Sequence, residues 1–236
     1  MESAVQASNV FPYLRSCKKE SEKAIDGQVQ GEIPNWLKGS LIRVGSGLLE
    51  VGPDRYNHVF DGLALMHKFS FNDGHVTYQN RFLRSDAYKT NMKHNRIVVN
   101  EFATAGIPDP YPWAPELPRI NYDYNGKKYK YFYAMARNAT LERTHLIKVD
   151  VTDKTTVSWN ESGVIPSEPV FISDPNAENK DEDSGVLIAS LLYQDDESKV
   201  SMIVLDAKSM KEIGRTTFKT ESSIPGDFHG VFIPKN

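Results

Sequence analysis

The sequence predicts an all-β protein, and three observations support this class. From Ser40 onward, short runs of β-branched and aromatic residues alternate with polar residues, which is typical of antiparallel strands. Turn residues separate these runs about every 8–12 residues, the spacing of sandwiches, barrels or propellers. Helix-forming sequence is scarce, and Ser85 to His94 is the stretch where a short helix or an ordered loop is expected.

The composition is that of a folded globular chain with no strong charge preference. The 236 residues are 39% hydrophobic and 25% charged, and they fit one large all-β domain or two small ones. A net charge of −3 gives no support for nucleic acid as a partner. The single cysteine, Cys17, excludes an internal disulfide and favours a reducing compartment. Neither a secretory signal in residues 1–12 nor a membrane span is expected.

The first half of the chain contains a predicted hairpin. Its first strand places four residues on one apolar face: Leu65, His67, Phe69 and Phe71. The turn residues 72–74 lead to a second strand over 75–83. On this face, His67 is expected to be a packed core residue rather than a metal ligand. Residues 96–104 form a further strand candidate.

The second half is predicted to be a series of strands joined by short turns. Asn125 and Gly126 favour a type I′ hairpin between strands over 120–124 and 127–135, because that turn needs positive φ at both central residues. The acidic run from Asp174 to Asp183 lacks the residue order of a calcium loop and is expected to be a solvated loop. Further strands are expected over 144–151, 155–159, 169–173, 185–193, 200–206, 213–218 and 229–233.

A proline-rich stretch separates the two halves. Five prolines fall within the twelve residues from Ile107 to Pro118, a density that neither a central strand nor a helix tolerates. We interpret it as a junction between two parts of the chain. The predicted organisation is an N-terminal segment (1–26), an N-terminal part (27–110), the junction (111–115) and a C-terminal part (116–236).

Spacing alone predicts no metal site among the histidines. None of the six forms a His-x-His or His-x3-His pair. His75, His94 and His145 are expected at the solvated surface. His229 opens the last predicted strand, next to a glycine that allows close backbone approach, and on spacing alone a structural role is favoured.

Two carboxylates are framed by prolines and apolar residues. Glu116 lies between Pro115 and Leu117, and Glu168 precedes Pro169 at the start of an apolar strand. A carboxylate in such a place must be paired if it is buried. Each is therefore either an ordinary strand-end charge or the partner of a specific group.

Two blocks of the sequence resemble the carotenoid cleavage oxygenases. The first, over residues 27–110, includes the stretches GEIPNWLKGSL (31–41), NHVFDGLALMH (57–67) and NRIVVNEF (95–102). The second, from residue 116 onward, includes ELPRINY (116–122), PSEPVF (166–171), LDAK (205–208) and FHG (228–230). The blocks stand in the family's order and together cover most of the chain.

The resemblance implies a seven-bladed β-propeller with a non-haem Fe(II) ion on its axis. In this family four histidines hold the iron and three glutamates orient histidines from behind. O2 is inserted across a polyene double bond of a carotenoid or retinoid substrate, and one branch instead isomerises a retinyl ester. His229 matches the last iron ligand, Glu116 and Glu168 match two of the orienting glutamates, and Phe60 matches an aromatic residue near the substrate tunnel. Peripheral membrane contact and a cytoplasmic or a mitochondrial location are also expected.

The chain departs from the family pattern in its centre. The family's central region carries the other three iron-ligating histidines and the third glutamate, and here the two blocks are joined directly across the proline-rich junction. We therefore expect a partial seven-bladed propeller, with the first and last blades joined and the central blades missing. Two hypotheses follow: an iron-dependent carotenoid oxygenase, or a non-catalytic shortened form that binds lipid or modulates the full-length enzyme. A lone imidazole should not retain iron, which favours the second for the isolated chain. Central cleavage, eccentric cleavage and isomerisation stay open.

Overall fold

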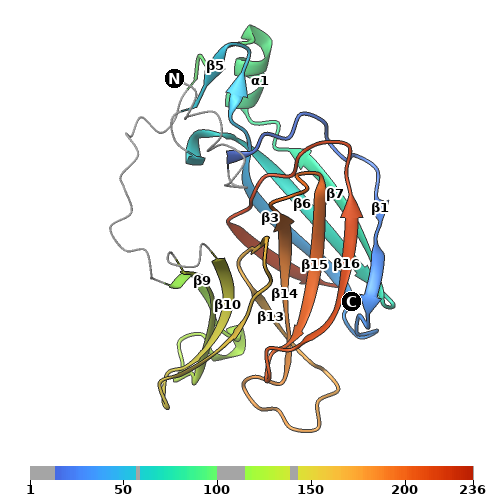
Figure 1. The fold of residues 1–236 in the computed structure, drawn as a ribbon, viewed down its shortest axis with the longest axis vertical. Helices are drawn as coiled ribbons and strands as arrows, with labels where there is room; N and C mark the ends of the chain where they lie inside the picture. The colour runs from blue at the N-terminus through green and yellow to red at the C-terminus, as the bar shows by residue number, and fades with distance from the viewer. Residues whose placement is uncertain (1–13, 57–58, 100–114, 139–142, 236) are drawn as a thin grey trace.

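The structure is a computed structural model that describes residues 14–56, 59–99, 115–138 and 143–235. The all-β prediction is confirmed, because the described residues form antiparallel sheets and a single α-helix. Figure 1 shows three sheets side by side, with the orange strands β13 to β16 between the yellow-green strands β9 and β10 and the blue and cyan strands β3, β6 and β7.

The five-stranded sheet combines the first long strands of the chain with its last strand. Its order is β1 (Ile25–Asp26), β7 (His75–Phe82), β6 (Leu63–Asn72), β3 (Gly39–Leu48) and β17 (His229–Pro234). In β6 the residues alternate strictly between buried and less buried positions, which matches the predicted strand face. The edge strand β17 pairs with β3 from the pair His229 and Val44 to the pair Pro234 and Gly39.

The six-stranded sheet combines C-terminal strands with one strand from the beginning of the chain. Its order is β12 (Val164–Pro166), β14 (Gly185–Tyr193), β15 (Lys199–Asp206), β16 (Glu212–Lys219) and β2 (Gln28–Gly31), and β13 (Val170–Ser173) also pairs with β14. The residues of β14 from Val186 to Tyr193 are all buried, so both faces of this strand are covered. A continuous apolar run is the sequence pattern of such a strand.

The four-stranded sheet and several short elements complete the described structure. The sheet has the order β11 (Thr155–Trp159), β10 (Arg143–Asp150), β9 (Tyr131–Asn138) and β8 (Pro115–Arg119). The short elements are β4 (Glu50–Val51), β5 (Asp54–Arg55), the 3-10 helices η3 (Val59–Asp61) and η4 (Tyr122–Tyr124), and the helix α1 (Asp86–His94). None of the sheets in the described residues closes on itself.

Two apolar clusters hold the sheets together, one on each face of the six-stranded sheet. The first joins it to the five-stranded sheet and includes Phe69, Tyr78, Ile188 and Phe218. The second joins it to the four-stranded sheet and includes Tyr133, Leu146, Leu187 and Ile203. Because successive side chains of a strand point to opposite faces, the neighbours Leu187 and Ile188 enter different clusters.

Several local expectations are met and others are not. The stretch around α1 is helical, and Ser85 caps its first turn by accepting a hydrogen bond from the amide of Tyr88. The hairpin predicted across Asn125 and Gly126 is wrong, because the residues before the turn form η4 instead of a strand. Residues 96–99 do not form a strand, and the rest of that candidate lies outside the described residues.

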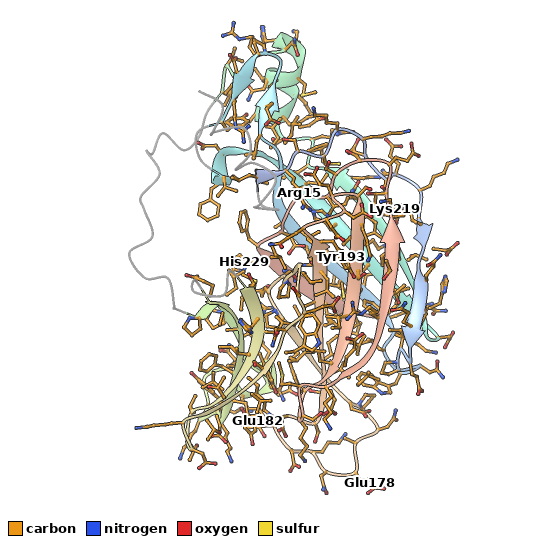
Figure 2. All side chains as sticks on the ribbon, viewed as in Figure 1. Arg15, Glu178, Glu182, Tyr193, Lys219 and His229 are labelled. Carbon is orange, nitrogen blue, oxygen red and sulfur yellow. The ribbon has the colours of Figure 1, made fainter. Side chains whose placement is uncertain are left out.

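The acidic run is not uniformly solvated as predicted. Asp183 is buried and forms an ion pair with Lys148, whose Nζ lies 2.6 Å from its Oδ2. The carboxylate of Glu182, labelled in Figure 2, accepts hydrogen bonds from the amides of Lys130 and Tyr131. Glu182 therefore anchors the loop to the start of β9 and Asp183 anchors it to β10, and local charge density did not indicate these tertiary partners.

Candidate metal centre

The central feature of the site is a histidine supported by a buried carboxylate. His229 opens β17, and its Nδ1 lies 3.0 Å from Oε1 of Glu168. The His229 side chain is 67% exposed, whereas that of Glu168 is 1% exposed. Because a carboxylate only accepts, the hydrogen-bond network assigns the ring proton to Nδ1 and leaves Nε2 as a free lone pair. This is the arrangement in which a carboxylate orients a metal-binding histidine.

Glu168 is held on both sides by strands of different sheets. It lies between β12 and β13, where Ser167 donates its amide hydrogen to the carbonyl of Ser190 at 2.9 Å. The hydroxyl of Ser167 accepts from the amide of Ser190 at 2.9 Å. On the other side, Oε2 of Glu168 accepts from the amide of Gly230 at 2.9 Å. Both carboxylate oxygens are therefore bound to β17, one through the imidazole and one through the backbone.

A cation from the four-stranded sheet also approaches this pair. Nε of Arg119 lies 3.9 Å from Oε1 of Glu168, and its Nη2 donates to the carbonyl of Gly230 at 3.0 Å. Figure 2 shows His229 beside the ends of the strands of that sheet. A buried carboxylate needs such partners, because an unpaired buried charge is costly.

A second buried ion pair lies behind the first. Arg43 on β3 is fully buried, and its Nε donates to Oδ1 of Asp227 at 2.5 Å. Its Nη1 donates to the carbonyl of Glu168 at 3.1 Å, and its Nη2 donates over a long 3.5 Å to the carbonyl of Phe228. Oδ2 of Asp227 accepts from the hydroxyl of Ser190 at 3.0 Å. Sequence reasoning missed Arg43 and Asp227, although period two already places Arg43 on the same strand face as Leu41.

Phe60 packs on the residue that precedes His229, and its role near a substrate tunnel stays a prediction. Its ring meets that of Phe228 edge to face, with 4.9 Å between the centroids. Phe228 directly precedes His229 in the chain, and Phe60 is 57% exposed. The structure thus places an exposed aromatic ring against Phe228, the residue before His229.

Glu116 occupies a different position. It lies exposed on β8, opposite Met135 of β9, next to a strand irregularity where Leu117 adopts a positive φ of 52°. Within the described residues, no hydrogen bond or ion pair joins the Glu116 carboxylate to a histidine. Its role as an orienting glutamate stays a prediction.

The other described histidines have separate surroundings. His67 is buried, as predicted, and its Nδ1 lies 2.9 Å from the hydroxyl of Tyr78. Burial lowers the pKa of His67 to about 4, although the nearby charge of Asp227 opposes this shift. His75 is exposed and lies 2.9 Å from the carboxylate of Asp26.

The two remaining described histidines are not alike. His94 is exposed at the end of α1, as predicted. His145 is instead half-buried on β10, and its Nε2 is buried without a described hydrogen-bond partner. His58 lies outside the described residues.

The described residues alone do not fit an iron site. No group of three or more histidine, cysteine, aspartate or glutamate side chains in the described ranges could hold a metal ion. A catalytic centre commonly uses about three protein ligands and an open position. His229 supplies one nitrogen donor, and its supporting carboxylate is already engaged by the imidazole and the Gly230 amide.

Sequence comparison identifies the family. The model of the retinal pigment epithelial membrane protein family, RPE65, matches residues 14–112 and 107–234. The chain belongs to this family.

Curated relatives carry names from carotenoid chemistry. The chain is 39% identical over 158 residues to the mitochondrial carotenoid-cleaving dioxygenase of Mustela putorius furo, which covers 63% of this chain and 29% of the relative. It is 49% identical over 113 residues to the carotenoid isomerooxygenase of Galleria mellonella, with coverages of 45% and 22%. It is 53% identical over 93 residues to human beta,beta-carotene 15,15'-dioxygenase, with coverages of 39% and 17%. These matches span less than a third of each relative's length.

Solved structures share the fold. An ACO/RPE65 chimera aligns with a TM-score of 0.82 and 14% identity over 96% of this chain and 98% of the chimera. A mutant of the Synechocystis apocarotenoid oxygenase aligns with a TM-score of 0.81 and 13% identity, with the same coverages. The fold is therefore that of the carotenoid oxygenase propellers. None of the helices in the described part of the chain could span a lipid bilayer.

Proposed function

We propose that this chain carries one corner of the Fe(II) centre of a carotenoid oxygenase, with His229 as an iron ligand and Glu168 as the residue that orients it. The single observation that supports this most is the 67% exposed side chain of His229, whose Nδ1 lies 3.0 Å from the buried carboxylate of Glu168. The reaction of the whole centre is oxidative cleavage of a carotenoid double bond by O2 to two carbonyl products. The names of the curated relatives support this substrate class.

Phe60 and Glu116 take secondary roles in this proposal. The exposed ring of Phe60, packed edge to face on Phe228, provides an apolar surface for a polyene. Glu116 would act as a second orienting carboxylate for a histidine that this chain does not supply. We assign peripheral membrane contact to uptake of the apolar substrate, and a cytoplasmic or a mitochondrial location fits these roles.

We further propose that the chain is organised as the first and last parts of a seven-bladed propeller. The two family matches overlap at residues 107–112, within the proline-rich stretch from Ile107 to Pro118. The strand exchange between β17 and β3 and between β2 and β16 supports direct packing of these two parts. In a propeller that lacks its central blades, the sheets that would have packed against those blades have no neighbour there.

The same observations favour a non-catalytic role for the chain on its own. A single imidazole donor binds Fe(II) only weakly and does not make a catalytic centre, and His67 and His75 are engaged by Tyr78 and Asp26. The chain by itself would then bind apolar ligands or modulate a full-length enzyme without turning carotenoid over.

Metal binding at His229 can be tested by paramagnetic broadening. Fe(II) is titrated anaerobically into the 15N-labelled chain, and broadening of the Gly230 amide is followed by NMR. We expect broadening in the wild-type chain and in His75→Ala, and its loss in His229→Ala. Equal broadening at Gly230 in His229→Ala would contradict the assignment of His229 as the ligand.

The non-catalytic role is tested separately with substrate. The chain is incubated aerobically with excess Fe(II) and β-carotene in detergent micelles, and aldehyde products are measured by chromatography. We expect none above the level of His229→Ala. Aldehyde formation by the wild-type chain alone would show that this chain is a complete enzyme.

A further inference from the structure

We propose that the buried pair of Arg43 and Asp227 is a clamp that positions His229 and Glu168 relative to each other. This inference rests on the proposed function, because the relative position of the two side chains matters for metal binding. Arg43 and Asp227 touch neither the imidazole nor the carboxylate of the pair in the described contacts, so they are positioning residues.

The guanidinium of Arg43 binds both segments that carry the site. Its Nη1 donates to the carbonyl of Glu168 at 3.1 Å, and its Nη2 reaches the carbonyl of Phe228, the residue before His229, at 3.5 Å. Glu168 and Phe228 are far apart in sequence: Glu168 lies between β12 and β13, and Phe228 lies between β16 and β17. One rigid planar group therefore fixes the backbone on both sides of the hydrogen bond between His229 and Glu168.

Asp227 extends the clamp to the central sheet. Its Oδ1 accepts from Nε of Arg43, and its Oδ2 accepts from the hydroxyl of Ser190 on β14. The carbonyl of Ser190 also accepts from the amide of Ser167, the residue before Glu168, and the amide of Ser190 donates to the hydroxyl of Ser167. The segments leading into Glu168 and His229 are thus tied to the same position of β14.

Two glycines allow the backbone to approach the clamp closely. A Cβ at Gly230 would lie 2.8 Å from Nη1 and 3.0 Å from Cγ of Arg43. A Cβ at Gly45 would lie 2.4 Å from the carbonyl of Gly226 and 2.6 Å from Cα of Asp227. The loop before His229 therefore lies directly on β3. A larger residue at position 45 would displace this loop, and one at position 230 would displace the Arg43 side chain.

The composition of the clamp favours positioning over simple stabilisation. The side chains of Arg43 and Asp227 are 0% and 6% exposed, so both charges have lost most of their hydration. A buried ion pair often adds little net stability compared with apolar residues of similar volume. What the pair provides here is directional contact with two carbonyls and a serine hydroxyl, which apolar side chains could not supply.

The experiment compares the metal-free wild-type chain with Arg43→Lys, which keeps the charge but loses the planar group. Hydrogen exchange is measured for the amides of Gly230 and of Ile203 in the core, together with the 15N shifts of the His229 ring at about two pH units above the usual histidine pKa. We expect the Gly230 amide to exchange about tenfold faster relative to Ile203, and the His229 ring to lose its single Nδ1–H tautomer.

Two further variants keep the test decisive. Ser190→Ala removes one hydrogen bond to Asp227. It should make the Gly230 amide exchange about threefold faster relative to Ile203, and this result can be obtained even if Arg43→Lys does not fold. Lys148→Met breaks a second buried ion pair, the one with Asp183, and serves as the matched control. We expect it to leave the ratio of the Gly230 and Ile203 exchange rates unchanged.

Equal acceleration of both amides in Arg43→Lys and Ser190→Ala, with an unchanged His229 tautomer, would overturn the clamp. The measurement uses no metal, so a chain that fails to bind Fe(II) at His229 can still confirm or refute the positioning role. Failure of the proposed function and failure of the clamp are therefore seen in different experiments.

Discussion

At the scale of single residues, the buried polar side chains are the ones that depend most on their partners. His67 lies on the core face of β6, directly opposite Arg43 of β3. Its lowered pKa means that the folded chain keeps it neutral, while the unfolded chain protonates it near the ordinary value of 6.5. Protonation of the unfolded state below that pH therefore draws the equilibrium toward unfolding.

This leads to a prediction about stability and pH. The contribution of His67 to the free energy of unfolding is fully present above pH 6.5. It is lost as the pH falls from 6.5 toward 4, because the unfolded state binds the proton first. The loss amounts to about 3 kcal/mol by pH 4. Urea unfolding of the wild-type chain and His67→Gln across this range should show a shallower pH dependence in the variant. The control is His75→Gln, a substitution at an exposed histidine. If the free energy of unfolding of His67→Gln depended on pH as steeply as that of the wild-type chain, the prediction would be wrong.

Whether the sequence predicts the role of a buried polar residue depends on where its partners lie along the chain. Strand alternation predicts His67 in the core. His229 and Glu168 are identified through a family resemblance, and the structure brings Nδ1 of His229 within 3.0 Å of Oε1 of Glu168. Arg43 and Asp227 carried no motif, because their partners come from distant segments of the chain. A charged residue on an apolar strand face was the one available signal.

At the scale of elements, the exchange of strands between sheets determines how the parts of the chain are joined. β2, near the beginning of the chain, pairs with β16, and β17, near its end, pairs with β3. Alternation of residues predicts a strand over 229–233 but none over 28–31, and it contains no information on which strand is the neighbour. For this reason β13, β14, β15 and β16 are predictable as strands, whereas the contribution of β2 to their sheet is not.

Gly31, the last residue of β2, provides a test of this exchange. It has a φ of +73°, and a Cβ there would lie 2.3 Å from the carbonyl of Ile213. Gly126 has the same φ, and a Cβ there would meet nothing within 4 Å, so Gly126→Ala reports the backbone penalty alone. We expect Gly31→Ala to lower the free energy of unfolding by about 1–3 kcal/mol more than Gly126→Ala in urea titrations. Equal effects would show that β2 does not need this close approach.

At the scale of the whole molecule, one face of the five-stranded sheet has no described partner of comparable size. The opposite face packs on the six-stranded sheet through Phe69 and Tyr78. On the open face, pairing register places Val44 beside Met66 and Val231 beside Ile42. Four apolar side chains of the sheet are substantially exposed there: Val44 at 41%, Met66 at 37%, Val231 at 54% and Ile233 at 51%.

Contiguous exposed apolar side chains on a sheet face favour association, because burying them removes apolar surface from water. We therefore expect the chain to self-associate in a concentration-dependent way, as measured by sedimentation velocity. Val44→Lys combined with Val231→Lys should weaken this association by about tenfold, or about 1.4 kcal/mol. Val157→Lys, at an exposed valine of β11 on a different sheet, is the matched control and should leave it unchanged. Monomeric wild-type protein at every concentration, or equal association of the double variant, would show that this face is stable in water without a partner.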